Sequence, residues 1–352
     1  MTNKRNFGLD IIRALAITGV FLGHGITSLG SLSDGVELFF VLSGFLIGRI
    51  YFRSRRDNSF SLGQFWISRW WRTLPPYLAA LGIIALAEHW IPSNPVNWSY
   101  LFFLQTFTGI KGFGPSWSLC VEEHFYLTLP LLAIAMERLI GKRHFIWLLP
   151  VAFFIPTLFR LGWMWHVGGL SHMPHEWYRM SQFHCDGLIA GVYLAYLIVE
   201  RPEWFQRVRR PALILAPLAF LVAIVTPFLQ GTILFESTQS LVVAIGFASW
   251  LRLAYEISWN PASVAGRLVQ KIVRGIALAS YSIYLLHTVG MSDLHILLHS
   301  WHRGAARSLF ILSTTLVVCI VFYFIFERTS IRTRDRYLTW RTTQRTRQEV
   351  TV

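Results

Sequence analysis

Charged residues and cysteines are scarce in this chain. Only 14% of its 352 residues are Asp, Glu, Lys or Arg, whereas an ordinary soluble domain has about 25%. The three cysteines, Cys120, Cys185 and Cys319, lie singly within apolar stretches, so their spacing argues against both a disulfide framework and a zinc site. The sequence also shows no internal repeat and no low-complexity tract. These absences argue against an ordinary soluble domain and a disulfide-stapled one.

Apolar and aromatic residues dominate instead. They include 15 Trp and 27 Phe, the apolar fraction is 54%, and the mean hydropathy is +0.46. The net charge of +14 comes from Lys and Arg that fall in short blocks between apolar stretches. Such blocks are typical of cytoplasmic loops under the positive-inside rule, and no basic aromatic-rich groove suggests nucleic-acid binding. The composition therefore predicts an all-α, polytopic transmembrane helical bundle.

The basic blocks also predict the topology. The lead MTNKRNFG and the arginine-rich end of the chain both fall inside, so we expect about ten spans with the N- and C-termini cytoplasmic. We treat the first span as retained, because no small-residue cleavage site follows it. The expected spans lie near 9–29, 35–52, 75–90, 117–136, 144–161, 182–199, 211–229, 237–255, 276–298 and 306–327.

The apolar segment near 97–110 is an exception to simple hydropathy. It is about a dozen residues long, whereas a spanning helix needs about 20. If it crossed the membrane, the basic block after residue 137 would lie outside, so we predict a short re-entrant or interfacial segment. We divide the chain into a transmembrane domain, 1–330, and a basic cytoplasmic tail, 331–352, which we expect to be disordered or to lie on anionic lipid.

The first apolar stretch, LDIIRALAITGVFLGHG, carries ionisable residues at helical spacing. Arg13 and His24 are eleven residues apart, which is close to three whole turns, so both project from one face of a helix about 16 Å apart along its axis. Asp10 lies one turn before Arg13, at a spacing where opposite charges can pair. Ionisable groups inside a span are costly and indicate function, so we expect His24 to lie well inside the span as a proton-accepting group.

Further ionisable residues interrupt later spans. We expect them to line a shared polar interior with His24, because they cannot all face lipid. Each one also has a structural alternative, which is a hydrogen bond to a neighbouring helix. These residues are Glu37, Glu122, Glu123, Asp186 and His287.

Several of these stretches resemble, in order, the motifs of the membrane acyltransferase-3 family of bacterial O-acyltransferases. The stretch LDIIRALAITGVFLGH resembles the family's first-helix signature. The stretch GVELFFVLSGFLI resembles its second-helix signature, with Glu37 where the family usually has Asp. The stretch FWISRWWRTLPPY resembles the family's paired-arginine motif. The stretch PSWSLCVEEHFYLTLP resembles its WSLxxExxFYLxxP pattern, and SYSIYLLH resembles its late SYxxYLxH element. Two positions depart from the family pattern: His184 replaces a frequent arginine, and Thr329 replaces the proline of a closing ERP-like element. The chain resembles the stand-alone transmembrane form, without a C-terminal hydrolase-like extension.

The resemblance implies transfer of an acyl group, typically acetyl from acetyl-CoA, to a hydroxyl of a carbohydrate or other envelope molecule. The family's essential histidine corresponds to His24, its first-helix arginine to Arg13, and its acidic WSLxxE residue to Glu122. Imidazole is suited to accept the hydroxyl proton near neutral pH, although His24 as a transient acyl carrier is an alternative. Arg69 and Arg72 lie one turn apart at the expected cytoplasmic boundary. Their guanidinium groups are suited to bind the phosphates of CoA, with help from Arg13. The alternative is that they only anchor the helix at the membrane surface.

We expect the remaining polar candidates to bind or orient substrates. The implied partners are acyl-CoA, a carbohydrate or lipid-linked glycan acceptor and membrane lipids, in the bacterial cytoplasmic (inner) membrane, with no metal and no nucleic acid. The acceptor would approach from the outer side near Glu37 and the 162–181 loop. The substrate-orienting candidates are Asp10, Glu37, Trp117, Ser118, Asp186 and His287.

Other protein classes fit less well. A multi-span transporter or flippase would also hold charges in the membrane, but no internal repeat is visible. A non-catalytic scaffold would bury these ionisable groups at a cost and without use. A metal site on His166, His172 and His175 is another idea, but these residues lack a recognised ligand spacing.

Overall fold

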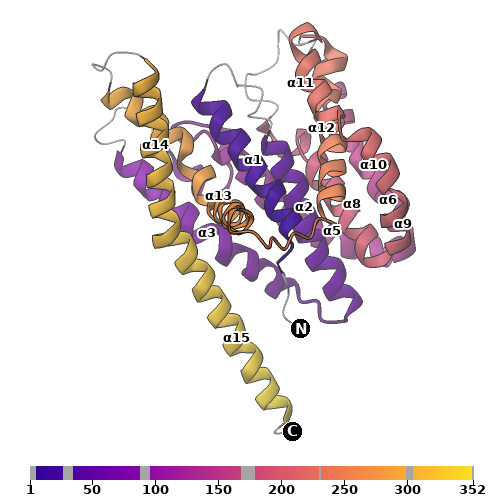
Figure 1. Cartoon of the computed structure of the whole chain (residues 1–352). Coiled ribbons are helices and arrows are strands. Elements are labelled where there is room, and N and C mark those ends of the chain that lie inside the picture. Colours follow the sequence, from indigo (N-terminus) through magenta and orange to yellow (C-terminus); the bar gives the residue numbers. More distant parts are fainter. Residues whose placement is uncertain are drawn as a thin grey trace. The chain divides into compact units, whose positions relative to one another are not determined.

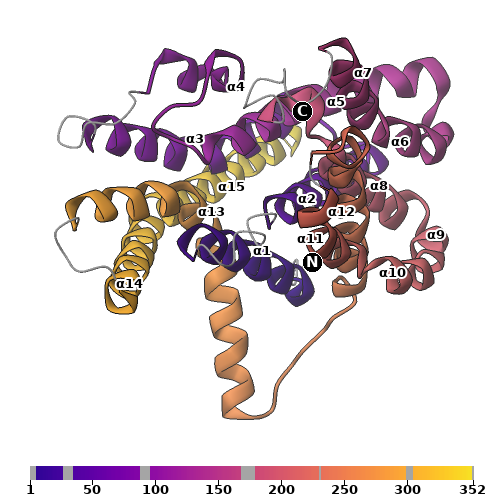
Figure 2. The same ribbon diagram turned by 90° about the horizontal axis from the view of Figure 1, so that it is seen from above.

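The computed structural model describes residues 5–26, 35–87, 96–167, 179–229, 231–298 and 304–350, and every regular element within these ranges is a helix (Figures 1 and 2). The chain divides into two compact units, each described here by itself. The larger unit comprises Met1–Phe60, Trp98–Ile110 and Pro115–Ser280, and the smaller comprises Ser61–Asn97, Lys111–Gly114 and Tyr281–Val352.

The larger unit contains most of the helices, and the first part of α13 (Val264–Leu297) also belongs to it. Its other elements, in chain order, are α1 (Phe7–Gly25), α2 (Gly35–Arg56), η2 (Trp98–Phe102), α4 (Gln105–Thr108), α5 (Ser116–Ile140), η3 (Lys142–His144), α6 (Phe145–Phe153), α7 (Ile155–His166), η6 (Ser181–Phe183), α8 (Asp186–Glu200), α9 (Pro202–Arg207), α10 (Arg209–Leu215), α11 (Leu218–Leu229) and α12 (Ile233–Ala254).

Helices α2 and α8 form the most closely packed pair of this unit. A Cβ added at Gly44 would lie 2.0 Å from the Leu188 carbonyl oxygen, and one at Gly191 would lie 2.0 Å from that of Val41. Because membrane helices gain little from the hydrophobic effect, small residues that let two backbones approach are a usual basis of such packing. The close approach fixes where the first turns of both helices, which carry candidate site residues, lie.

The smaller unit contains α3 (Leu62–Ala87), the second part of α13, α14 (Ala305–Phe322), the π-helical turn η7 (Tyr323–Glu327) and α15 (Arg328–Val350). Figure 1 shows α14 continuing into α15 as one long rod. The Tyr281 hydroxyl donates to the Thr73 carbonyl at 2.9 Å, and the Ser330 hydroxyl donates to the Trp71 carbonyl at 2.6 Å. These bonds tie α3 to α13 and α15.

Eight helical segments are long and apolar enough to cross a membrane, so the chain forms a polytopic membrane bundle. The two other expected spans correspond to α3, which carries Arg69 and Arg72, and to α8, which has only 15 residues. About ten spans with cytoplasmic termini therefore stays a prediction. The eight segments are Phe7–Gly25, Gly35–Arg56, Ser116–Ile140, Lys142–His166, Pro202–Thr226, Ile233–Ala254, Val264–Leu297 and Ala305–Trp340.

Three segments can be compared with the boundaries that the sequence predicts. Helix α1 ends at Gly25 and not near residue 29, because the Ile26 backbone is extended. The segment near 97–110 contains only η2, of five residues, and α4, of four, both too short to cross a bilayer. Residues 331–350 continue α15 as a helix, so disorder, one of our two expectations for the tail, does not match the structure. The domain boundary near 330 stays a prediction.

Candidate active site

The end of helix α1 carries the histidine that sequence motifs singled out. His24 lies in the last turn, one residue before the helix ends, and its side chain is exposed. Our expectation of a histidine well inside the span was wrong because the helix stops at Gly25. The ring nitrogen Nδ1 lies 2.9 Å from the Val20 carbonyl oxygen. If Nδ1 donates its proton there, Nε2 becomes the atom with the basic lone pair.

The start of α1 is fixed by an arginine that we did not single out from the sequence. Arg5 precedes the helix and donates from Nε and Nη2 to the buried carboxylate of Asp10 at 2.7–2.8 Å. The Asn6 side chain caps the helix by accepting from the Leu9 backbone N–H at 3.0 Å. Arg13 is half-buried. Asp10 therefore has Arg5 as a close ionic partner, and the proposed Asp10, Arg13 and His24 stripe stays a prediction.

Glu122 of α5 belongs to a hydrogen-bond chain that reaches α2. The hydroxyl of Tyr126, one turn further along α5, donates to Glu122 Oε2 at 2.6 Å. The same hydroxyl bonds to the Ser43 hydroxyl of α2. Tyr126 is buried and therefore fixes one oxygen of the Glu122 carboxylate. We did not single out Tyr126 from the sequence, although it lies inside the FYL part of the motif.

A second cluster, the Glu37–His184 cluster, forms between the first turn of α2 and the residue that follows η6, just before α8. Glu37 Oε1 bonds to His184 Nε2, and both side chains are only about a tenth exposed. The His184 ring lies edge-on to Trp117 and Phe40, with centroids 5.1 and 5.7 Å away. The cluster thus brings together two predicted residues, Glu37 and Trp117, through a histidine that the sequence presented only as a departure from the family pattern.

Beside this cluster lies a buried ion pair between Arg160 of α7 and Asp186 of α8. The guanidinium makes two contacts with the carboxylate, at 2.7 and 3.0 Å, and both residues are 1% exposed. Arg160 also donates to the Ser237 carbonyl at 2.7 Å and to the Thr157 hydroxyl at 2.8 Å. We missed Arg160 in the sequence, although an arginine inside an apolar span is itself a signal. Asp186 is therefore held rigidly by its partner.

One of the remaining candidates, Ser118, has a local backbone partner. The Ser118 hydroxyl donates to the Pro115 carbonyl at 3.3 Å in the first turn of α5. Nearby, Gln105 donates to the Ser116 carbonyl at 3.2 Å, which ties α4 to the start of α5. Glu123 is buried. These contacts position the WSL motif.

In the smaller unit, Arg69 and Arg72 lie on α3, and both are half-buried. His287 is buried, with Nδ1 2.8 Å from the Tyr284 carbonyl oxygen. Glu327 accepts from the Ser282 backbone N–H at 3.1 Å and from its hydroxyl at 2.6 Å. The late SYSIYLLH motif and the closing glutamate are therefore bonded to each other.

Part of the expected acceptor loop lies outside the described residues, and so do two of the three histidines of the possible metal site. His172 and His175 fall there, whereas His166 is the last residue of α7. Among the residues that the structure describes, no group of three or more His, Cys, Asp or Glu side chains comes together to hold a metal ion.

Comparison with known sequences decides the family. A family model described as an acyltransferase domain matches residues 6–326. The chain belongs to the acyltransferase-3 family. This confirms the resemblance that the motifs indicated.

Relatives with curated names are distant and longer. "Putative O-acetyltransferase SACOL0978" of Staphylococcus aureus strain COL is 25% identical over 323 residues, which cover 82% of this chain and 51% of the relative. O-acetyltransferase OatA of Staphylococcus aureus strain NCTC 8325 is 25% identical over 317 residues, which cover 80% of this chain and 49% of the relative. The chain thus spans about half the length of these relatives. No solved structure matches.

Proposed function

We propose that this protein is a membrane O-acyltransferase that moves an acetyl group from acetyl-CoA to a hydroxyl of a carbohydrate or envelope glycan, in the bacterial cytoplasmic membrane. The match of the acyltransferase family model to residues 6–326 carries this proposal. The names of the two relatives support the acetyl group and the oxygen acceptor.

His24 is the proposed general base. It removes the proton from the acceptor hydroxyl while the oxygen attacks the thioester carbonyl carbon of the donor. The carbon–sulfur bond then breaks, and the proton passes from His24 to the departing thiolate of coenzyme A. The exposed ring at the end of α1 supports this role, because a base must reach its substrate. Glu122 would stabilise the protonated imidazole, as the carboxylate does in other histidine-dependent sites.

The donor is proposed to bind through its phosphates. Arg69 and Arg72 are one turn apart on α3 and suit bidentate guanidinium contacts with phosphate oxygens, with Arg13 as a further contact. The bonds from Tyr281 and Ser330 to the α3 backbone support the proposal, because they fix the carbonyls of the two residues that flank Arg72.

The acceptor is proposed to meet the outer ends of α2 and α8. Glu37 supplies an acceptor for sugar hydroxyls, and the Trp117 ring supplies an apolar face. Asp186 orients this end of α8 through its ion pair with Arg160. Asp10, Ser118 and His287 are the other proposed orienting residues. Transfer would then take place between a cytoplasmic donor and an outer acceptor within a bundle of about ten spans.

The test measures transfer of radiolabel from labelled acetyl-CoA to an envelope extract, using membranes that contain the wild type or His24→Ala. We expect a labelled glycan or lipid fraction with the wild type only. His144→Ala, half-buried in the turn after α5, is the matched histidine control and should label like the wild type. Equal labelling by His24→Ala would contradict the mechanism, and no labelling by the wild type would contradict the proposed donor and favour a transporter.

A further inference from the structure

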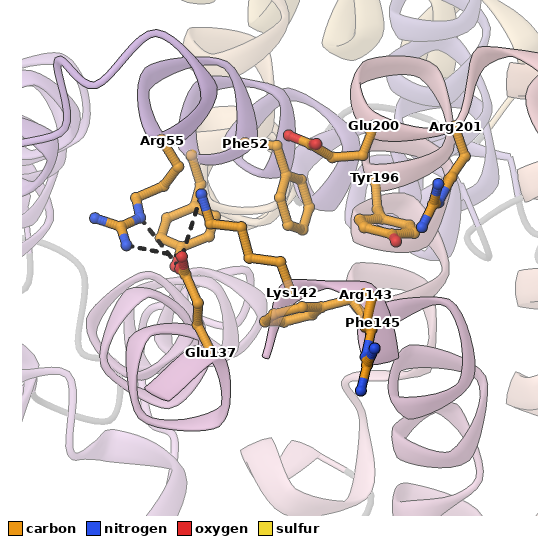
Figure 3. Close-up of a pocket in the computed structure, with 10 residues that line it drawn as sticks. Phe52, Arg55, Glu137, Lys142, Arg143, Phe145, Tyr196, Glu200 and Arg201 are labelled. Carbon is orange, nitrogen blue, oxygen red and sulfur yellow. Dashed lines mark hydrogen bonds and ion pairs between the residues drawn. The ribbon is translucent and has the colours of Figure 1, made fainter. Parts of the chain in front are cut away.

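A cavity of about 170 Å³ in the larger unit lies where α2, α5 and α8 end and α6 begins (Figure 3). A single water needs roughly 10–15 Å³ of such space, so the cavity has room for a small chemical group. None of its lining residues is among the proposed site residues. We call it the Glu137 pocket, and it is lined by Tyr51, Phe52, Arg55, Glu137, Lys142, Arg143, Phe145, Tyr196, Glu200 and Arg201.

Glu137 organises two of the four cations that line this pocket. Its Oε1 lies 2.9 Å from Arg55 Nη2 and 3.2 Å from Lys142 Nζ, and Oε2 accepts from Arg55 Nε at 3.2 Å (Figure 3). The Glu137 side chain is only 14% exposed. One carboxylate therefore holds a guanidinium and an ammonium in fixed positions at the pocket wall.

The other two cations, Arg143 and Arg201, have no ion pair or side-chain hydrogen bond among the residues that the structure describes. Four cations face only two carboxylates, Glu137 and Glu200, so the pocket carries an excess of two positive charges. A phosphate monoester carries about −1.5 to −2 charges at neutral pH. Its oxygens also match the fork of donors that a guanidinium presents.

One wall of the pocket is aromatic and buried. Phe52, Phe145 and Tyr196 are each at most 5% exposed. Their rings contact one another, with centroid separations of 5.4 Å between Phe52 and Tyr196 and 6.0 Å between Phe52 and Phe145. A wall of low dielectric strengthens the attraction between the cations and an anion in front of it.

We propose that the Glu137 pocket binds a phosphate monoester. The positive-inside pattern assigns these helix ends to the cytoplasmic side, where the phosphate comes either from the headgroup of an anionic lipid or from a soluble ligand. Cations that served only as topology anchors would have no need of a cavity, of an aromatic wall, or of a half-buried carboxylate that holds two of them in place.

The test compares phosphate binding by variants of the full chain purified in detergent. Arg143→Gln with Arg201→Gln removes the two cations that lack partners. Arg138→Gln with Arg210→Gln is the matched control, because both residues are exposed, lie outside the pocket and change the net charge equally. Binding is followed as the dose-dependent shift of the thermal unfolding midpoint.

Two probes distinguish the sources of phosphate. Inorganic phosphate is titrated against chloride at equal ionic strength, and dioleoyl phosphatidic acid in the micelle is titrated against dioleoyl phosphatidylcholine. We expect at least one probe to bind the wild type and the control at least tenfold more tightly than the pocket variant. A response to the lipid alone assigns a headgroup, and a response to both assigns the phosphate itself.

Equal binding by the pocket variant and the control would overturn the proposal, as would a wild type that responds to neither probe. Should the double variant not fold, the single variants Arg143→Gln and Arg201→Gln provide the same comparison. Because the readout does not depend on acyl transfer, failure of the phosphate-binding proposal is distinguishable from failure of the proposed function.

Discussion

The end of α1 and the interior between α7 and α8 handle their ionisable groups in opposite ways. His24 is exposed, with Nδ1 beside the carbonyl of Val20 in its own helix. Arg160 and Asp186 are almost fully buried, and Arg160 donates to at least three partners besides the carboxylate. The contrast is between an exposed histidine, which we propose as the base, and a buried ion pair that holds helices together.

The largest structural effect is expected at the buried pair. Arg160→Met leaves Asp186 without its cation in a low-dielectric interior, which costs about 3–5 kcal/mol. We expect a large fall in the thermal unfolding midpoint in detergent. Arg210→Met, on the exposed surface of α10, is the control and should leave the midpoint unchanged. An unchanged midpoint for Arg160→Met would remove the distinction between the two regions.

The Glu37–His184 contact should have an intermediate effect. Glu37→Gln keeps the shape of the side chain but removes the charge from a hydrogen bond between largely buried groups, and such bonds contribute about 1.5–3 kcal/mol. A double-mutant cycle with His184→Gln measures the coupling through unfolding midpoints. Additive effects would show that the two side chains do not interact.

Tyr126→Phe should have a smaller effect. It removes the hydroxyl that joins Glu122 of α5 to Ser43 of α2, and a typical hydrogen bond contributes about 0.5–1.5 kcal/mol. We also expect a lower rate of acyl transfer, because one oxygen of Glu122 loses its fixed donor. A variant with the wild-type midpoint and rate would show that this chain of bonds has no positioning role.

The smallest effect is expected at the surface pair formed by Glu256 just after α12. Hydrogen bonds from Arg252 hold the pKa of the Glu256 carboxyl below its usual value, with a further contribution from Arg209. The pair therefore stabilises the folded protein above about pH 4.3, the usual glutamate pKa, and this stability is lost as the pH falls through the lowered value.

Glu256 is about a third exposed, so solvent screening limits the contribution of the pair to about 0.2–1 kcal/mol. Glu256→Gln should lower the unfolding midpoint slightly at pH 7 and leave it equal to that of the wild type below the lowered pKa. A difference that persists unchanged at acidic pH would refute the electrostatic origin.

The helices of the bundle could be predicted from the sequence, because hydropathy and basic blocks are local signals. The motifs that identify the family are equally local. Contacts between distant residues could not be predicted in this way. Arg160 lies 26 positions before Asp186, and nothing in the spacing of one apolar span indicates which residue of another span it meets.

The apolar pattern of the sequence also led to a wrong prediction of where helix α1 ends. The apolar pattern continues beyond Gly25, but the backbone of Ile26 is extended, and this places His24 at the end of α1. Arg5, which precedes the helix, reaches the Asp10 carboxylate, and helical spacing did not indicate this contact. Spacing rules apply within a helix, and they do not include the residues that precede it.

The most direct test of the account is the effect of His24→Ala on rate and on stability in the same purified sample. Acetyl transfer and the thermal unfolding midpoint are measured together for the wild type, His24→Ala and the control His144→Ala. We predict a loss of transfer rate of about 10²–10⁴-fold, typical of a lost general base, with an unchanged midpoint. A variant that keeps its rate, or that loses rate only in proportion to lost stability, would show that His24 is structural.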